Sequence, residues 1–399
     1  MPKPVIIAGA GPAGSVLALS LAKANIDVIL LEKFDSLPID LRASTFHPPS
    51  LELLEGLGVI QPMLDKGLIV DRYQYRDRKT GEVAEFNMKA ISDITRHPYR
   101  LQLEQYELTH IIYDELKQYP NVKVLFGHKL IGFEQDNNQV QVDVEYEGQA
   151  KRLVGSYLLG CDGASSNVRK SAGIDYEGFT YDENFLVVST SFPFEEVFEN
   201  LSYVNYVSDP DQWCVILRTD KLWRVLWPTD PNEKNLDKYL EADFIQAQLQ
   251  KLHPKEGDYD IGHKTLYKVH QRVAKDYYQG RMVLVGDACH INNPLGGMGM
   301  NGGLHDAFNL ADKLIRIIND GEDHAALFAH YQRQRKDLAV QFVQKHTIEN
   351  KKLMEANDPD VQRKRQAMFM ATAADPVKAK AFIRERAMID CLNESEAVQ

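Results

Sequence analysis

The feature that most constrains the fold lies near the N-terminus, where a short apolar run, residues 4–8, leads into Gly9-Ala10-Gly11-Pro12-Ala13-Gly14. A segment with helical patterning, residues 15–24, and a second apolar run, residues 27–31, come next. Strand, glycine-rich turn, helix and strand in this order predict a βαβ unit that binds a dinucleotide. Gly9 would permit the tight turn, Gly11 would let the backbone approach a pyrophosphate, and Gly14 would let the helix pack closely on the strand.

The residues around this fingerprint complete a nucleotide site. Glu32 ends the second strand, where an acid commonly accepts hydrogen bonds from the adenosine ribose. We also assign Ala13, Lys33 and Leu130 to the cofactor site. The fingerprint alone does not distinguish FAD from NAD, although its position at the extreme N-terminus favours FAD.

Two later segments narrow the choice of cofactor. The first, residues 157–169, is an apolar strand that reaches Asp162-Gly163 and then a helix start; by itself it is compatible with a plain strand-to-helix corner. The second, residues 281–303, is a buried strand that ends at Gly286-Asp287, continues through a glycine-rich loop and enters a helical pattern at residues 304–318.

The chemistry of a flavin suits this last segment. Asp287 could hold hydroxyl groups of the ribityl chain or ribose, and Gly296, Gly297 and Gly299 could lie flat against the ring system. Reduced flavin is an anion, and a helix N-terminus near Met300 and Asn301 would stabilise it with backbone N–H groups.

These three motifs, in this order and spacing, resemble those of the class A flavoprotein aromatic hydroxylases, the para-hydroxybenzoate hydroxylase-like monooxygenases. The resemblance covers roughly the first 350 residues. It implies cofactor contacts at positions that match the family's motifs: Gly9, Gly11, Gly14, Glu32, Arg42, Gln105, Asp162, Gly163, Gly286, Asp287, Pro294, Met300 and Asn301.

The resemblance also implies the activity. NADH or NADPH would reduce FAD, dioxygen would form a flavin C4a-hydroperoxide, and an aromatic phenolic or heteroaromatic substrate would be hydroxylated. The alternatives are another FAD oxidoreductase on the same fold (an epoxidase, N-hydroxylase or halogenase) and a flavin-binding sensor without turnover. No second complete GxGxxG unit is present, which favours transient docking of NAD(P)H in the cleft.

The predicted fold class is α/β, with a Rossmann-type FAD-binding domain, an inserted β-sheet substrate domain and a C-terminal helical segment. We expect the FAD-binding domain to comprise residues 1–70, 95–180 and 265–350, and the substrate domain residues 71–94 and 181–264. Strands are expected at residues 69–76, 83–88, 185–192, 201–207, 213–218 and 223–227. Residues 351–399 read as helices that pack on the FAD-binding domain or form a subunit contact in a homodimer.

Residues for catalysis and substrate binding are harder to identify from sequence. His47 is the candidate for proton transfer, with helix capping or packing as its structural alternatives, and His290 is expected to be structural. The candidates for substrate contact are Tyr203, Tyr206, Arg218, Arg224, Pro294 and Gly296. Because side chains alternate along a strand, half of those on the predicted sheet should face away from the site.

Composition excludes several other classes of function. A formal net charge of −11 argues against nucleic acid as a partner. The four cysteines are scattered without a CxxC pair, which indicates reduced thiols in a cytoplasmic protein rather than a zinc site or a disulfide framework. No stretch approaches the roughly 20 apolar residues of a membrane span.

Overall fold

The computed structural model describes residues 3–39, 41, 43–209, 211–355 and 358–398, and its first sheet is built on the apolar N-terminal run. This six-stranded sheet has the order β18-β19-β12-β1-β2-β8, and all its neighbours are parallel except the edge strand β18. Its strands are β1 (Val5–Ala8), β2 (Val28–Leu31), β8 (Val122–Leu125), β12 (Tyr157–Gly160), β18 (Tyr278–Gln279) and β19 (Met282–Leu284). Every residue of β1, β12 and β19 is buried, as expected for central parallel strands covered on both faces.

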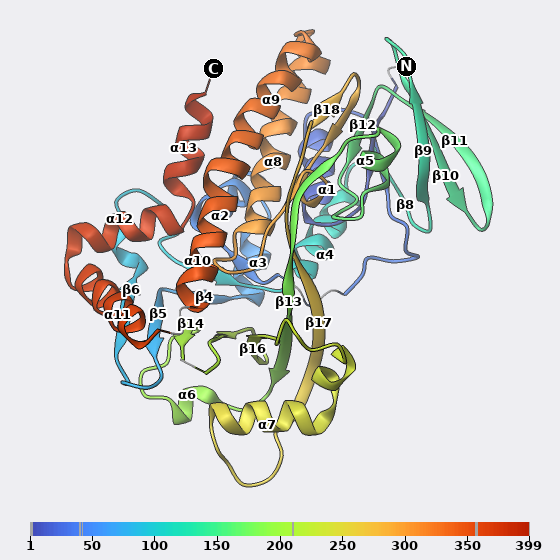
Figure 1. Cartoon of the computed structure of the whole chain (residues 1–399). Coiled ribbons are helices and arrows are strands. Elements are labelled where there is room, and N and C mark those ends of the chain that lie inside the picture. Colours follow the sequence, from blue (N-terminus) through green and yellow to red (C-terminus); the bar gives the residue numbers. More distant parts are fainter. Residues whose placement is uncertain (1–2, 40, 42, 210, 356–357, 399) are drawn as a thin grey trace.

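The helices of the chain pack around the two main sheets, with α8 and α9 forming the long central pair in Figure 1. Helix α1 packs on both α8 and α4, which joins segments almost 300 residues apart. The helices are α1 (Pro12–Lys23), α2 (Pro48–Gly56), α3 (Ile60–Lys66), α4 (Gln105–Leu116), α5 (Asn167–Ser171), α6 (Phe194–Val197), α7 (Ala242–Leu252), α8 (Met298–Ile315), α9 (His324–Leu338), α10 (Lys345–Glu355), α11 (Pro359–Ala374), α12 (Pro376–Arg386) and α13 (Ile389–Ala397).

A second sheet of eight strands has the order β20-β17-β13-β16-β15-β14-β5-β6. Its strands are β5 (Arg72–Asp77), β6 (Val83–Asn87), β13 (Tyr176–Thr190), β14 (Val204–Ser208), β15 (Cys214–Arg218), β16 (Trp223–Pro228), β17 (Ile261–Ala274) and β20 (His290–Ile291). All neighbouring pairs are antiparallel except β5 and β14, which are parallel. The long strands β13 and β17 run from this sheet up to the first one (Figure 1).

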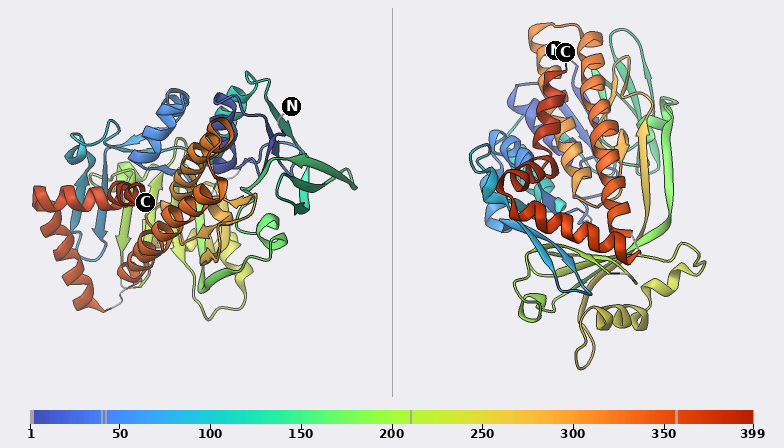
Figure 2. Two further views of the ribbon diagram at one scale, coloured as in Figure 1. Left: turned by 90° about the horizontal axis from the view of Figure 1, so that it is seen from above. Right: turned by 60° about the vertical axis from the view of Figure 1, so that its left-hand side comes forward.

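The two faces of the second sheet have different coverings. Tyr206 and Leu226 belong to a core shared with the C-terminal helices and Leu295, whereas Ile216 and Trp223 pack on the other face with residues of α7. Figure 2 shows the C-terminal helices α11 and α12 beside β5 and β6, with which α11 is in contact. We call the face that carries Tyr206 the inner face and the face that carries Trp223 the outer face.

Two three-stranded sheets complete the fold. One has the order β3-β7-β4, and the other, β11-β10-β9, extends from the end of the molecule near the N-terminus (Figure 1). Their strands are β3 (Thr45–Phe46), β4 (Leu68–Val70), β7 (Arg100–Gln102), β9 (Lys129–Gln135), β10 (Val140–Tyr146) and β11 (Gln149–Gly155). Among the described residues, no helix is both long and apolar enough to cross a membrane.

The predicted fold class is confirmed, and the differences concern the bounds of elements. The third motif enters α8 at Met298, earlier than the helical pattern at residues 304–318 suggests. Strands β13 and β17 cross the expected domain boundaries near residues 180 and 265, because each pairs with the other over almost its whole length. In the C-terminal region α11 ends at Ala374 and Pro376 begins α12, where the Asp375 side chain caps the helix.

Candidate active site

The turn between β1 and α1 is built to bring backbone close to a ligand. Gly9 has φ +102°, and a Cβ there would lie 2.5 Å from the carbonyl oxygen of Cys161. A Cβ on Gly14 would lie 2.0 Å from the carbonyl oxygen of Gly9, so helix and strand touch only because both residues lack side chains. A Cβ on Gly11 would meet no other described atom within 4 Å, which leaves space at the N-terminus of α1, where a phosphate would be stabilised.

The second motif lies directly against the first. One oxygen of the Asp162 carboxylate, Oδ2, accepts hydrogen bonds from the backbone N–H groups of Asn167 (2.6 Å) and Val168 (3.1 Å). The other oxygen, Oδ1, is buried without a partner among the described residues. The Asn167 side chain donates to the carbonyl of Leu130 at 2.9 Å, which places Leu130 at the same corner. A buried acceptor of this kind is costly unless a ligand donates to it.

Glu32 and the third motif approach the same turn from other sides. The Glu32 carboxylate accepts from the N–H groups of Ala10 and Phe34, each at 3.1 Å. A Cβ on Gly286 would lie 3.5 Å from Cβ of Ala13, so the third motif adjoins the first. Asp287 is exposed, unlike its neighbours Gly286 and Ala288. The three motifs therefore meet at one place, although they are spread over almost 280 residues of the chain.

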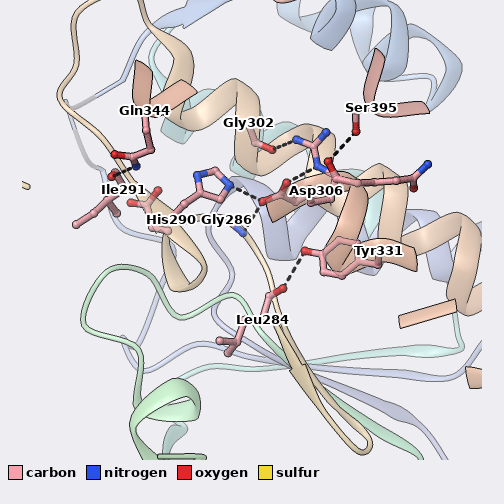
Figure 3. Close-up of polar contacts among 12 residues, drawn as sticks. Leu284, Gly286, His290, Ile291, Gly302, Asp306, Tyr331, Gln344 and Ser395 are labelled. Carbon is pink, nitrogen blue, oxygen red and sulfur yellow. Dashed lines mark hydrogen bonds and ion pairs between the residues drawn. The ribbon is translucent and has the colours of Figure 1, made fainter. Parts of the chain in front are cut away.

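A buried charge cluster holds Gly286 against α8 (Figure 3). The Asp306 carboxylate is fully buried, and it accepts from Arg335 Nε at 2.6 Å, from His290 Nε2 at 2.8 Å and from the Gly286 backbone N–H at 3.2 Å. Burial alone would raise the pKa of Asp306, but the charges and hydrogen bonds of His290 and Arg335 outweigh it and hold that pKa well below its usual value. His290 therefore has the structural role that the sequence suggests.

Asn301 fastens the N-terminus of α8 to the segment around His47. Its side-chain oxygen accepts from the His47 backbone N–H at 2.9 Å and from the Ser50 hydroxyl at 2.7 Å. Its side-chain nitrogen donates to the carbonyls of Thr45 (2.8 Å) and Gly297 (2.7 Å). The amide is thus fully used inside the protein. Only backbone N–H groups at the start of α8, beginning at Met298 after the left-handed Gly297, remain for a ligand.

His47 is fully buried beside the glycine-rich loop, and its geometry fixes its tautomer. Nε2 lies 2.8 Å from the carbonyl oxygen of Gly296 and must donate to it, since a carbonyl only accepts. Nδ1 is then an acceptor, and it has no partner among the described residues. His47 is the N-cap residue of α2 but its side chain does not cap the helix, so the capping alternative is wrong. Burial, followed by the charge of Arg100, lowers the pKa of His47 to about 3, so the ring is neutral near pH 7.

Arg100 is the first residue of β7 in the small sheet, and its side chain reaches Tyr73 in β5 of the large one. It is 2% exposed, and its guanidinium lies 4.1 Å from the centre of the Tyr73 ring. Tyr206 is within its electrostatic reach. Tyr75 stacks on Tyr206 with the ring centres 4.9 Å apart. The cluster of His47, Arg100, Tyr73, Tyr75 and Tyr206 is called the aromatic site below.

The predicted substrate residues divide between the two faces of the large sheet. Tyr206 and Arg224 share the inner face, where Arg224 forms a buried ion pair with Glu104 at 2.7 Å. Arg218 alternates with Leu217 onto the outer face, where it lies over the Trp223 ring. Tyr203, at the edge of Trp223, is 38% exposed. The structure therefore places Arg218 and Tyr203 away from the aromatic site. Pro294 and Gly296 lie in the loop beside it, with Gly296 bonded to His47.

The remaining predicted contacts lie at the margin of the cofactor region. Arg42 lies outside the described residues. Gln105 begins α4 and donates its backbone N–H to Ala43 at 2.9 Å, while Lys33 is exposed over the Phe34 ring. Gly163, Gly299 and Met300 are partly buried in the second motif and at the start of α8.

Three buried residues of this region are not among those predicted from the sequence: Arg100, Asp306 and Arg335. Arg100 and Gln102 alternate on one side of β7, and such polar alternation in a buried strand is a weak signal that could have drawn attention to Arg100. For Asp306 and Arg335, no local signal exists, because the partners lie 29 residues apart on different helices.

Comparisons with known proteins agree with this site. Residues 3–346 match the protein family described as "FAD binding domain". The chain is 30% identical over 381 residues to para-nitrophenol 4-monooxygenase of Pseudomonas sp., covering 95% of this chain and 94% of that protein. It is 31% identical over 358 residues to 6-hydroxy-3-succinoylpyridine 3-monooxygenase of Pseudomonas putida, covering 88% of each. The crystal structure of p-nitrophenol 4-monooxygenase from Pseudomonas putida superimposes with a TM-score of 0.91 at 28% identity, over 98% of both chains.

Proposed function

Because this chain belongs to the FAD binding domain family, among relatives that are flavin-dependent aromatic hydroxylases, we propose that it hydroxylates a phenol of one aromatic ring at the aromatic site. The protein is an FAD-dependent aromatic monooxygenase that uses NAD(P)H as reductant. The observation that carries the proposed substrate is the free acceptor of His47, buried beside the glycine-rich loop and within the electrostatic reach of Arg100, which lies over the Tyr73 ring. A phenol offers the matching donor on an apolar ring.

The residues of the three motifs fit FAD, and we propose the following contacts. Glu32 holds the adenosine ribose, and the N-terminus of α1 at Gly11 receives the pyrophosphate. Asp162 and Asp287 hold hydroxyl or phosphate groups in the middle of the cofactor, and the first N–H groups of α8 stabilise negative charge on the flavin. When bound, FAD supplies the electron transfer and the activation of dioxygen that amino-acid side chains lack.

His47 acts on the substrate as a neutral acceptor. Since Nε2 is committed to Gly296, the phenol hydroxyl donates to Nδ1, which orients the ring and increases electron density on it. A ring nitrogen with a pKa of about 3 holds a proton only briefly, so His47 polarises the hydroxyl rather than storing its proton. This differs from the expectation of a histidine whose pKa suits full proton transfer.

Substrate-dependent oxidation of NAD(P)H by the FAD-loaded protein tests this proposal. The panel is 4-nitrophenol, a hydroxypyridine with an acidic side chain, a hydroxyphenylpropionate and a two-ring phenol, with products analysed by mass spectrometry. A one-ring phenol should accelerate oxidation and gain one oxygen atom. If every phenol stimulated only peroxide release, or if only the two-ring phenol were hydroxylated, the proposal would be wrong.

A comparison of two histidine variants tests the role of His47 in the reaction. His47→Gln should lower kcat about 100-fold while FAD content is unchanged. His253→Gln is the matched control, because His253 stacks on Phe192 on the outer-face side of the sheet. Equal kcat values in the two variants would remove His47 from the mechanism.

The proposal extends to organisation and location. The pieces 1–70, 95–180 and 265–350 serve the cofactor and the pieces 71–94 and 181–264 serve the substrate, with β13 and β17 shared between them. We also propose that the protein works in the cytoplasm, where NAD(P)H is available and its four unpaired thiols stay reduced, and that it forms a homodimer.

A further inference from the structure

Arg100 is a buried cation without a neutralising acid. Among the described residues no carboxylate forms an ion pair with it; Tyr206 is a side-chain hydrogen-bond partner, and Nε is fully buried without a partner. Two carboxylates of neighbouring elements have other partners: Glu104 pairs with Arg224 at 2.7 Å and Glu385 with His346 at 2.7 Å. A guanidinium held out of water in this way binds a partner of opposite charge more strongly than an exposed one does.

Three of the groups that surround Arg100, namely Tyr73, Tyr75 and His47, do not supply that charge. Burial raises the pKa of Tyr73 strongly and that of Tyr75 to about 12, so both phenols are neutral near pH 7. His47 is neutral as well, and the charge of Arg100 contributes to the lowering of its pKa. The cation therefore faces aromatic rings and a histidine acceptor, an arrangement suited to the binding of a flat anionic ligand.

A second guanidinium reinforces the positive potential. Arg386, the last residue of α12, lowers the pKa of both Tyr73 and Tyr75 through its charge, although burial outweighs this effect. It donates a hydrogen bond to the Asn350 side chain, which in turn donates to the Leu295 carbonyl at 3.2 Å. Two arginines from distant parts of the chain thus flank the tyrosines and connect to the loop beside His47.

We propose that Arg100 binds a negatively charged oxygen of the aromatic substrate, so that this enzyme selects substrates that bind as anions. This inference rests on the proposed function, because it concerns the substrate of the same site. The anionic oxygen is either a separate acidic group on the ring, which leaves the phenol hydroxyl to donate to His47, or the ionised phenol itself, which has no proton for His47 and is held by Arg100 instead. In both cases the ligand supplies the negative charge that pairs with Arg100. Loss of Arg100 therefore removes the preference for anions.

The test measures binding of three ligands of similar size to the FAD-loaded enzyme without reductant, followed by the absorbance change of flavin or ligand. 4-Nitrophenol provides a phenolate near neutral pH, 4-hydroxybenzoate provides a carboxylate with a neutral phenol, and 4-methylphenol provides no charge. The variants are Arg100→Met, Arg100→Lys and, as a matched control, Arg218→Met on the outer face.

At least one anionic ligand should bind the wild type roughly tenfold or more tightly than 4-methylphenol, and Arg100→Met should abolish that difference. Arg100→Lys should keep part of it, and Arg218→Met should behave as the wild type. Preference for 4-nitrophenol, together with a lowered pKa of the bound ligand, would identify the phenolate as the partner. Preference for 4-hydroxybenzoate would identify a separate acidic group.

Two results would overturn the inference: equal binding of 4-methylphenol and both anions by the wild type, or equal preference in Arg100→Met and Arg218→Met. If Arg100→Met lost its FAD, the wild-type preference and the Arg100→Lys variant would still decide the question. Failure of the proposed function would look different, because no ligand would then be hydroxylated. Failure of this inference leaves hydroxylation intact and removes only the role of charge.

Discussion

Among single residues, Gly11 and Gly14 differ in the space around them. Because of this difference, alanine at Gly14 should affect folding, whereas alanine at Gly11 should affect cofactor binding. Gly14 has no room for a Cβ, whereas Gly11 has open space and an ordinary backbone conformation with φ −70°. Gly14→Ala should destabilise the apoprotein by about 1–3 kcal/mol, because a methyl group must push helix from strand. Gly11→Ala should leave the apoprotein unchanged and weaken FAD binding roughly tenfold or more, because its methyl group takes the space of the pyrophosphate.

Urea unfolding of the two variant apoproteins measures their stability, and fluorescence titration measures their affinity for FAD. Gly56→Ala, also without close neighbours but near the end of α2, is the control for a glycine remote from the motifs. Normal FAD affinity in Gly11→Ala would show that the pyrophosphate does not approach this turn.

Residues of the motifs could be predicted because their chemistry is encoded in neighbouring positions. Gly9, Asp162 and Gly286 each sit at a strand end whose apolar run is visible in the sequence. Arg218 and Arg224 show what strand alternation cannot predict. Alternation places neighbouring residues on opposite faces of the sheet, but it does not say which face is turned toward the cofactor region. That is decided by the packing of α7 against one face. For Arg100 the alternation in β7 is only a weak signal, since its surroundings depend on Tyr73 and Tyr206, which lie 27 and 106 residues away in the chain.

Among the elements, helices α8 and α9 depend on the ion pair between Asp306 and Arg335. Arg335→Met would leave Asp306 buried with only His290 and the Gly286 N–H, and stability should fall by about 3–5 kcal/mol. FAD should also bind less tightly, because the same carboxylate holds Gly286 in place. Adding Asp306→Asn should recover part of the stability, since it removes the stranded charge.

Arg333→Met is the control on the same helix, because Arg333 is exposed. Chemical unfolding of the FAD-free proteins gives the stability, and titration gives the FAD affinity. If Arg335→Met and Arg333→Met unfolded at the same urea concentration, the cluster would have no structural role.

Helices and strands were predictable from the sequence where apolar residues form a clear run or period. They were less predictable where glycine is frequent. The N-terminal βαβ unit and the strands β15 and β16 follow apolar runs with clear bounds. Helix α8 begins in a stretch that contains Gly299, Gly302 and Gly303, residues that disfavour helix on their own. Tertiary packing overrides that preference, because a Cβ on Gly303 would lie 3.2 Å from Cα of Gly286, so glycine here allows the close approach of the third motif.

In the molecule as a whole, the sequence predicted the class of fold but not how its parts cover one another. The resemblance in three motifs was sufficient to expect a sheet assembled from distant pieces. That α11 and α12 pack on β5 and β6 and bring Arg386 toward the tyrosines depends on side-chain complementarity between segments about 300 residues apart. No local pattern in the chain records such a match.

The stability of the whole molecule should fall between about pH 6.5 and pH 5 because two histidines are buried in their neutral form. His47 and His305 are at most 1% exposed, and burial lowers the pKa of each to about 3. In the unfolded chain, a histidine has a pKa of about 6.5. Below that pH the unfolded state therefore binds more protons than the folded state, and this lowers the free energy of unfolding. The contribution is complete above pH 6.5, and it is lost as the pH falls toward 3.

Together the two histidines should reduce the free energy of unfolding by about 2 kcal/mol between pH 6 and pH 5. Asp306 acts in the same direction but only at lower pH, because its pKa is depressed and an unfolded aspartate titrates near pH 4. Urea unfolding of the enzyme in excess FAD across pH 5–8 measures the slope. The double variant His47→Gln/His305→Gln should flatten it and His253→Gln should not; a wild-type slope near zero would mean that both rings accept protons in the folded state.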